Sequence, residues 1–93
     1  MRFKFDKGKS ERLRNDPRRT IGFEEAQELF YNTFLEDQHA DYPNQWRAIG
    51  WVKNQLYTVV YEEREDEKGE YYHLVTLWKA TQKERGYYEE YTK

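Results

Sequence analysis

The chain contains no cysteine, which excludes disulfides and thiolate metal sites. Its two histidines, His39 and His73, lie too far apart in the sequence to suggest a zinc motif. There is no nucleophile elbow and no glycine-rich phosphate loop. The sequence therefore predicts no metal ion and no other cofactor, and any catalysis must come from ordinary side chains.

Long hydrophobic runs are absent as well, and the first residues, Arg2 to Asp6, mix charged and apolar side chains. Neither a signal peptide nor a membrane span is indicated. We therefore expect a cytoplasmic protein that does not contact a membrane. At 93 residues the chain is predicted to form a single domain, residues 1–93.

What the chain does contain is aromatic and charged residues. Aromatics make up 18% of the sequence and include nine tyrosines, enough to fill a small core and leave some for the surface. Eight of the sixteen lysines and arginines fall within residues 1–19, against three of the eighteen acidic residues, although the net charge is only −2. This basic segment suits an anionic partner that is gripped locally, or it is simply a solvated helix face.

Local signals mark the ends of the predicted helices. Asp6 is a suitable N-cap, and Pro17 disfavours helix in the residue before it. Thr81 and Glu84 match the capping box at the start of the last helix. The predicted elements are a strand at 2–5, helices at 7–15 and 23–34, a loop at 36–45, strands at 46–52 and 56–61, a mobile loop at 62–70, a strand at 71–78 and a helix from 82. Residues 33–35 could instead begin an edge strand.

This order predicts an α+β fold. Consecutive strands with short connections favour an antiparallel meander of about four strands, with two N-terminal helices and a C-terminal helix packed on it. On the strand at 46–52, Arg47 is expected to lie on the face opposite to Trp46.

An enzyme of this composition would have to use arginine, lysine, tyrosine and histidine. These residues suit metal-free cleavage of RNA, because the 2′-hydroxyl is the nucleophile and the protein need only offset phosphate charge and move protons. Paired carboxylates such as Glu62 and Glu63 are interpreted as solvated. His73 is either a proton-transfer group or a half-exposed polar residue of its strand.

Four segments resemble the BrnT toxins of type II toxin–antitoxin systems, which are small ribonucleases of RelE-like fold. Phe5-Asp6 with Lys9 resembles that family's opening W-D-x-x-K, and Ile21 to Ala26 is similar to its G-I-S-F-E-E-A segment. Val59-Val60-Tyr61 with Arg64 is similar to its V-V-Y-x-x-R strand end, and Thr76 to Glu89 resembles its S-A-R-K-A-T-x-x-E-R-x-x-Y-E finish. The segments occur in the family's order along nearly the whole chain.

The resemblance implies a metal-independent RNA endonuclease that inhibits translation. It also implies a cognate antitoxin of ribbon-helix-helix type, similar to BrnA, through which the toxin would reach operator DNA only indirectly. In two places the chain departs from the family pattern. Trp78 stands where the family usually has arginine, and residues 15–22 lack the usual histidine.

The candidate site residues follow from this resemblance and from the charge pattern. The proposed catalytic residues are Lys9, Arg64 and Lys79 as phosphate ligands and Tyr88 or His73 for proton transfer. The proposed RNA-binding residues are Arg47, Trp78, Lys7 and Arg12.

Each candidate also has a purely structural interpretation. Arg47 could be a cross-strand partner, Arg64 a loop cation, Tyr88 a core anchor and Trp78 a core residue. At the level of the whole chain, two alternatives to the nuclease stay open. One is a non-catalytic RNA- or protein-binding module on the same scaffold, and the other is a structural subunit of an assembly.

Overall fold

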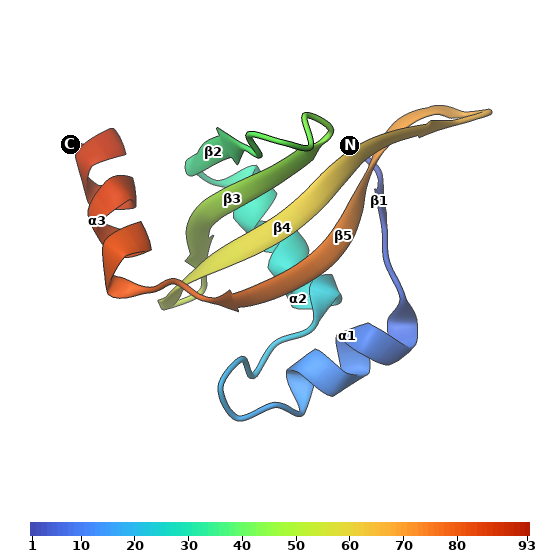
Figure 1. Ribbon diagram of the computed structural model, residues 1–93. Coiled ribbons are helices and arrows are strands. Elements are labelled where there is room, and N and C mark those ends of the chain that lie inside the picture. The colour runs from blue at the N-terminus through green and yellow to red at the C-terminus, as the bar shows by residue number, and fades with distance from the viewer.

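A five-stranded mixed sheet forms the centre of the computed structural model, which describes residues 1–93 (Figure 1). The strands are β1 (Phe3–Lys4), β2 (Phe34–Gln38), β3 (Gln45–Val52), β4 (Gln55–Asp66) and β5 (Gly69–Lys79). The helices are α1 (Lys7–Arg14), α2 (Phe23–Ala26), the 3₁₀ helix η1 (Gln27–Tyr31) and α3 (Gln82–Tyr91). None of these helices has the length and the apolar surface that spanning a bilayer requires.

The order of strands in the sheet is β1-β5-β4-β3-β2. Strands β2 to β5 form an antiparallel meander, as predicted, and the short β1 adds a fifth, parallel strand beside β5. The α+β class is therefore confirmed, whereas the predicted all-antiparallel sheet is corrected to a mixed one.

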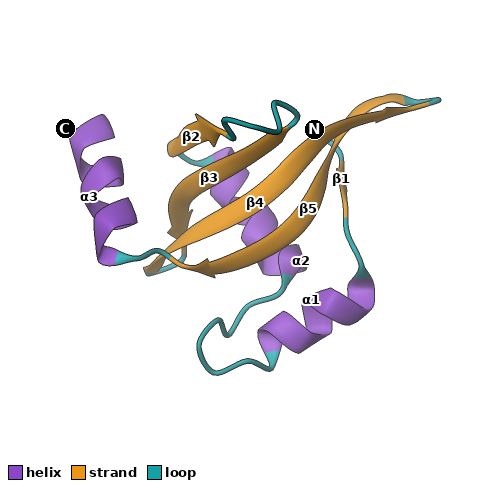
Figure 2. Ribbon diagram, in the orientation of Figure 1, coloured by secondary structure: helices purple, strands orange, loops and turns teal.

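One face of the sheet carries the main hydrophobic core. Helix α2 and η1 lie behind the sheet in Figure 2 and pack their buried residues on this face. The core consists of Leu13, Phe23, Ala26, Leu29, Phe30, Ala48, Val52, Tyr57, Val59, Tyr61, Leu74 and Leu77. Phe23, Ala26, Leu29 and Phe30 are thus the contact surface of these helices with the sheet.

Helix α1 is attached to the start of α2 by a polar contact. The buried Ser10 hydroxyl accepts a hydrogen bond from the Phe23 N–H at 2.7 Å and donates to the Glu24 carboxylate. A Cβ atom at Gly22 would lie only 2.4 Å from the Ser10 oxygen, so glycine is required here. Because α1 has Leu13 as its one buried apolar residue, this contact fixes the position of a mostly polar helix.

Helix α3 packs on the opposite face of the sheet, at one end (Figure 1). Tyr88 is buried there against Ile49 and Leu56. The predicted capping box is present, since the Thr81 hydroxyl accepts from the Glu84 N–H and the Glu84 carboxylate accepts from the Thr81 N–H. The Asp6 N-cap of α1 is confirmed in the same way.

Three predicted boundaries are wrong. The helix predicted at 23–34 ends at Tyr31, because Phe34 begins the edge strand β2, the alternative left open by the sequence. The loop predicted at 36–45 is correspondingly shorter. The mobile loop predicted at 62–70 is a pair of strands, since β4 and β5 stay paired to the Asp66–Gly69 position and turn only at residues 67–68.

This hairpin extends because its charges are paired. Asp66 accepts hydrogen bonds from the side chains of Arg2 at 2.7 Å and Lys4 at 2.7 Å. Gly69 adopts a φ of +110°, which glycine allows without strain. The N-terminal residues therefore tie down a hairpin that looks hydrophilic and unstructured in the sequence.

Candidate functional site

The face of the sheet opposite the main core is open between α3 and the β4–β5 turn (Figure 1). Strand alternation and the observed register decide which side chains lie on this face. They include Arg47 on β3, Thr58, Val60, Glu62 and Arg64 on β4, and Tyr71, His73, Thr76 and Trp78 on β5. We call this surface the open face.

A β-bulge brings His73 and Trp78 to the same face. The register of β4 with β5 shifts between Val60 and Tyr61, and Val75 has no partner opposite it. In an uninterrupted strand, His73 and Trp78 would point to opposite sides of the sheet, because they are separated by an odd number of positions. The extra residue reverses the alternation and joins the two halves of the open face.

At one end of the open face, the structure brings together Glu62, Arg64 and His73, which we call the histidine cluster. The charge of Lys9, on α1, also acts on His73. Glu62 and His73 are cross-strand partners. Arg64 donates to Glu62 at 2.6 Å and 3.1 Å, and this hydrogen bond is the main reason that the pKa of Glu62 is lowered. Gln45 also donates to Glu62, at 3.3 Å. Glu62 is therefore a positioned carboxylate beside the imidazole.

The imidazole of His73 lies in an environment that disfavours its charged form. Its pKa is lowered, first by burial and then by the positive charge of Arg64, with a further contribution from Lys9, while Glu62 opposes the shift. At neutral pH, His73 is uncharged and able to accept a proton.

At the other end, Glu84 of α3 organises a second group, which we call the Glu84 network. The buried Glu84 carboxylate accepts hydrogen bonds from the Thr58 hydroxyl at 2.9 Å, from the Trp78 indole at 3.0 Å and from Arg47 at 3.2 Å. Burial acts to raise the pKa of Glu84, but the hydrogen bonds from Thr81, Trp78 and Thr58 and the charge of Arg47 outweigh it, so the net shift is downward. This carboxylate is ionised and fully used in hydrogen bonds.

Arg47 and Trp78 are thus held in place at this end. Arg47 bridges two carboxylates, since it also donates to Asp37 at 2.5 Å. Trp78 keeps its ring on the open face while its N–H is bound to Glu84. Of the residues expected to bind RNA, Arg47 has its charge balanced by acidic neighbours, and Trp78 presents an aromatic ring.

The remaining predicted residues lie elsewhere. Lys79 is the register partner of Tyr57, a main-core residue, so it projects from the face opposite to Trp78. Tyr88 is buried, and its hydroxyl donates to the Thr33 carbonyl at 3.0 Å. Lys7 and Arg12 are exposed on α1. The structure therefore groups Arg64 and His73 on one face and separates Lys79 and Tyr88 from them.

Two acidic residues were not recognised from the sequence as parts of a site. Glu62 was interpreted as a solvated loop residue because the strand was predicted to end before it. Glu84 was recognised only as half of a capping box, and its contacts with Thr58 and Arg47 are long-range. The alternation of Val60, Glu62 and Arg64 was the only available signal for Glu62. No group of histidine, aspartate and glutamate side chains in the structure could hold a metal ion.

A scan against protein-family models found no match to this chain, and a search of curated proteins found none either.

Proposed function

We propose that this protein is a BrnT-type ribonuclease toxin that cleaves RNA without a metal ion and thereby inhibits translation in the cytoplasm. The observation that supports this best is the histidine cluster, where an uncharged imidazole lies beside a carboxylate and an arginine on an open surface and also feels the charge of Lys9. A base and phosphate ligands are the groups that RNA cleavage by its own 2′-hydroxyl requires. The resemblance of the four sequence segments to the family is the second support.

In the proposed reaction, His73 accepts the proton of the 2′-hydroxyl. The 2′-oxygen attacks the adjacent phosphorus, the bond to the 5′-oxygen breaks, and a 2′,3′-cyclic phosphate remains. Arg64 and Lys9 offset the charge that develops on the phosphate oxygens. In this scheme Lys9 protonates the leaving 5′-oxygen, and Glu62 positions Arg64.

This assignment revises the roles expected from the sequence. Tyr88 has no part in it, because its hydroxyl is bound to a backbone carbonyl inside a core. Lys79 would contact RNA only outside the cleavage point, since it projects from the other face of the sheet. The catalytic set is therefore reduced to Lys9, Arg64 and His73, with Glu62 as a positioning residue.

The proposed partner is the antitoxin that the resemblance implies, a ribbon-helix-helix protein encoded beside the toxin. Expression of this chain alone should arrest growth and fragment RNA, and co-expression with that antitoxin should restore growth. The antitoxin, rather than this chain, would contact operator DNA.

The test is cleavage of a single-stranded RNA by the purified protein in the presence of a chelator. We expect His73→Gln to reduce the cleavage rate at least about 100-fold, because general acid–base catalysis contributes that much or more. Arg64→Gln and Lys9→Gln should also reduce it. The matched control is Lys83→Gln, which removes an exposed cation from α3 and should cleave like wild type.

Two outcomes would contradict the proposal. One is intact RNA after incubation with soluble, folded wild-type protein. The other is cleavage that survives His73→Gln and is abolished by Lys79→Gln, because the active face would then be the opposite one.

One observation favours the alternative, a non-catalytic RNA- or protein-binding module. Both arginines of the open face are paired with carboxylates, Arg47 with Asp37 and Glu84 and Arg64 with Glu62. Such pairing leaves less free positive charge for a phosphorane than the family's extra arginine would supply. RNA that is bound with steep salt dependence but never cut would support this alternative.

A further inference from the structure

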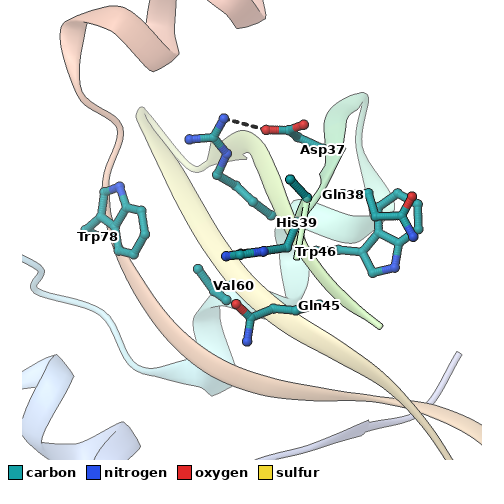
Figure 3. A pocket seen from close by; sticks show the side chains of 9 residues that line it. Asp37, Gln38, His39, Gln45, Trp46, Val60 and Trp78 are labelled. Atoms are coloured by element: carbon teal, nitrogen blue, oxygen red, sulfur yellow. Dashed lines mark hydrogen bonds and ion pairs between the residues drawn. The ribbon is translucent and has the colours of Figure 1, made fainter. Parts of the chain in front are cut away.

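A cavity of about 570 Å³ opens on the open face between the ends of β2, β3 and β5 and the middle of β4 (Figure 3). Its floor includes Val60, and Trp78 and His39 come from its two sides. The other lining residues are Asp37, Gln38, Ala40, Gln45, Trp46 and Arg47. Arg47 and Trp78 are two of the residues expected to bind RNA.

The walls of the cavity are held in place before any ligand arrives. The Trp78 indole is bound through its N–H to Glu84, and the Arg47 guanidinium is bound to Glu84 and Asp37. A flat aromatic ring and a flat guanidinium are therefore presented at fixed positions. Preorganised groups of this kind lose little conformational entropy when a ligand binds.

His39 is oriented by the turn that follows β2. Its Nδ1 accepts hydrogen bonds from the backbone N–H groups of Asp41 at 3.0 Å and Tyr42 at 3.3 Å. The neutral ring therefore carries its proton on Nε2. Figure 3 shows the imidazole pointing toward the side of the cavity on which Trp78 lies, so this N–H is available to a bound molecule.

We propose that this cavity binds one unpaired nucleobase of a single-stranded RNA, stacked on Trp78 and hydrogen-bonded by His39. The inference rests on the proposed function, because it assigns a base-binding subsite beside the same cleavage site. An unstacked base offers a flat π-surface to an aromatic side chain and a polar edge to donors and acceptors. The cavity offers both, since Trp78 supplies an aromatic ring and His39 supplies a donor, and hydrogen bonds hold each side chain in place.

The cavity lies next to the histidine cluster. Val60 on its floor and Glu62 are next neighbours on the same face of β4, about 6.6 Å apart along the strand. Gln45 lines the cavity and also donates to Glu62. A base in the cavity would therefore lie beside a phosphate held by Arg64 and Lys9.

The same arrangement favours RNA over a free nucleotide. The cavity's own cation, Arg47, is engaged by two carboxylates and has little charge left for a terminal phosphate. The phosphate ligands lie in the neighbouring cluster, where the chain of a polynucleotide would continue. Recognition of the base and recognition of the phosphate are thus provided by two adjacent sites.

The experiment measures binding of short 2′-O-methylated RNA, which cannot be cleaved because its 2′-oxygens are blocked. The comparison ligands are an abasic oligonucleotide of the same length and sugar, and a 5′-mononucleotide. The variants are Val60→Phe, which fills the cavity, and His39→Ala, which removes the donor. The matched control is Leu35→Phe, which enlarges an aliphatic side chain of β2 outside the cavity. Urea unfolding checks that each variant is folded.

We expect wild type and Leu35→Phe to bind the base-bearing RNA at least about tenfold more tightly than the abasic chain, since stacking of one base supplies that much. Val60→Phe and His39→Ala should lose this discrimination while still binding the abasic chain as wild type does. Equal affinity of wild type for both oligonucleotides would overturn the proposal, and so would unchanged discrimination in folded Val60→Phe. A mononucleotide that binds as tightly as the RNA would overturn the assignment to RNA.

These outcomes are independent of the nuclease assay. Base-dependent binding without cleavage of unmodified RNA would refute the proposed nuclease and leave the base-binding site standing. Cleavage without base-dependent binding would do the reverse.

Discussion

The two ends of the open face use the same kinds of residue in different ways. In the Glu84 network, a carboxylate with 7% side-chain exposure binds Arg47, whose side chain is 33% exposed. In the histidine cluster, Glu62 is 21% exposed and its partner Arg64 is 46% exposed. One carboxylate–arginine pair is part of the structure, and the other lies where a ligand can reach it.

The difference lies in what surrounds each carboxylate. Glu84 receives hydrogen bonds from Thr58, Trp78, Thr81 and Arg47, so none of its acceptor capacity is left for a ligand. Glu62 receives bonds only from Arg64 and Gln45 and faces a histidine. Residue type and pairing alone therefore do not distinguish a structural ion pair from a candidate active site. The two kinds of site differ instead in how deeply the carboxylate is buried and in how many hydrogen bonds it accepts.

The largest effect expected from this comparison is the loss of stability on Glu84→Ala. The substitution leaves a hydroxyl, an indole N–H, a helix-capping N–H and a guanidinium without their common acceptor. Breaking a buried charged network in this way costs about 3–5 kcal/mol of unfolding free energy. Urea denaturation measures it, with Glu89→Ala on the exposed side of α3 as the control. A loss no greater than that of Glu89→Ala would show that the network is not structural.

A smaller effect is expected when the two arginines are compared directly. Arg47→Gln should lower the free energy of unfolding by about 1–2 kcal/mol, because one donor to a buried carboxylate is lost. Arg64→Gln should leave the urea midpoint unchanged, since exposed ion pairs contribute little. It should instead weaken RNA binding and flatten its salt dependence, by removing one phosphate contact. If Arg64→Gln lowered the free energy of unfolding more than Arg47→Gln did, Arg64 rather than Arg47 would belong to the structural ion pair.

The smallest expected effect is a dependence of stability on pH that comes from the histidine cluster. Burial and the charges of Arg64 and Lys9 lower the pKa of His73, so the unfolded chain binds this proton more readily than the folded one. Stability should therefore rise with pH between the folded pKa and the ordinary value near 6.5. The measurement compares urea midpoints at pH 5 and pH 7 for wild type and His73→Gln. The urea midpoint of wild type should rise more between pH 5 and pH 7 than that of His73→Gln. An equal rise would show that the pKa of His73 is not lowered by folding.

If the proposed function holds, the lowered pKa of His73 also predicts how the cleavage rate depends on pH. A general base must be unprotonated, so the cleavage rate should rise through the lowered pKa of His73 and level off near neutral pH. The pH profile of the cleavage assay described above measures this without any further variant.

The parts of this protein that the sequence by itself determined are those that depend on local chemistry. The Asp6 cap, the capping box of Thr81 and Glu84 and the antiparallel meander are predicted by the sequence and confirmed by the structure. These features involve residues a few positions apart or strands joined by short turns. Their backbone hydrogen bonds and side-chain periodicity can be read directly from neighbouring residues.

Tertiary structure alone decided how the candidate site is assembled. A single bulge at Val75 determines that His73 and Trp78 share a face and that Lys79 lies on the other. The long β4–β5 hairpin depends on Arg2 and Lys4, which approach Asp66 from the far end of the sequence. Such contacts depend on strand register and on partners more than sixty residues away, and no local pattern encodes them.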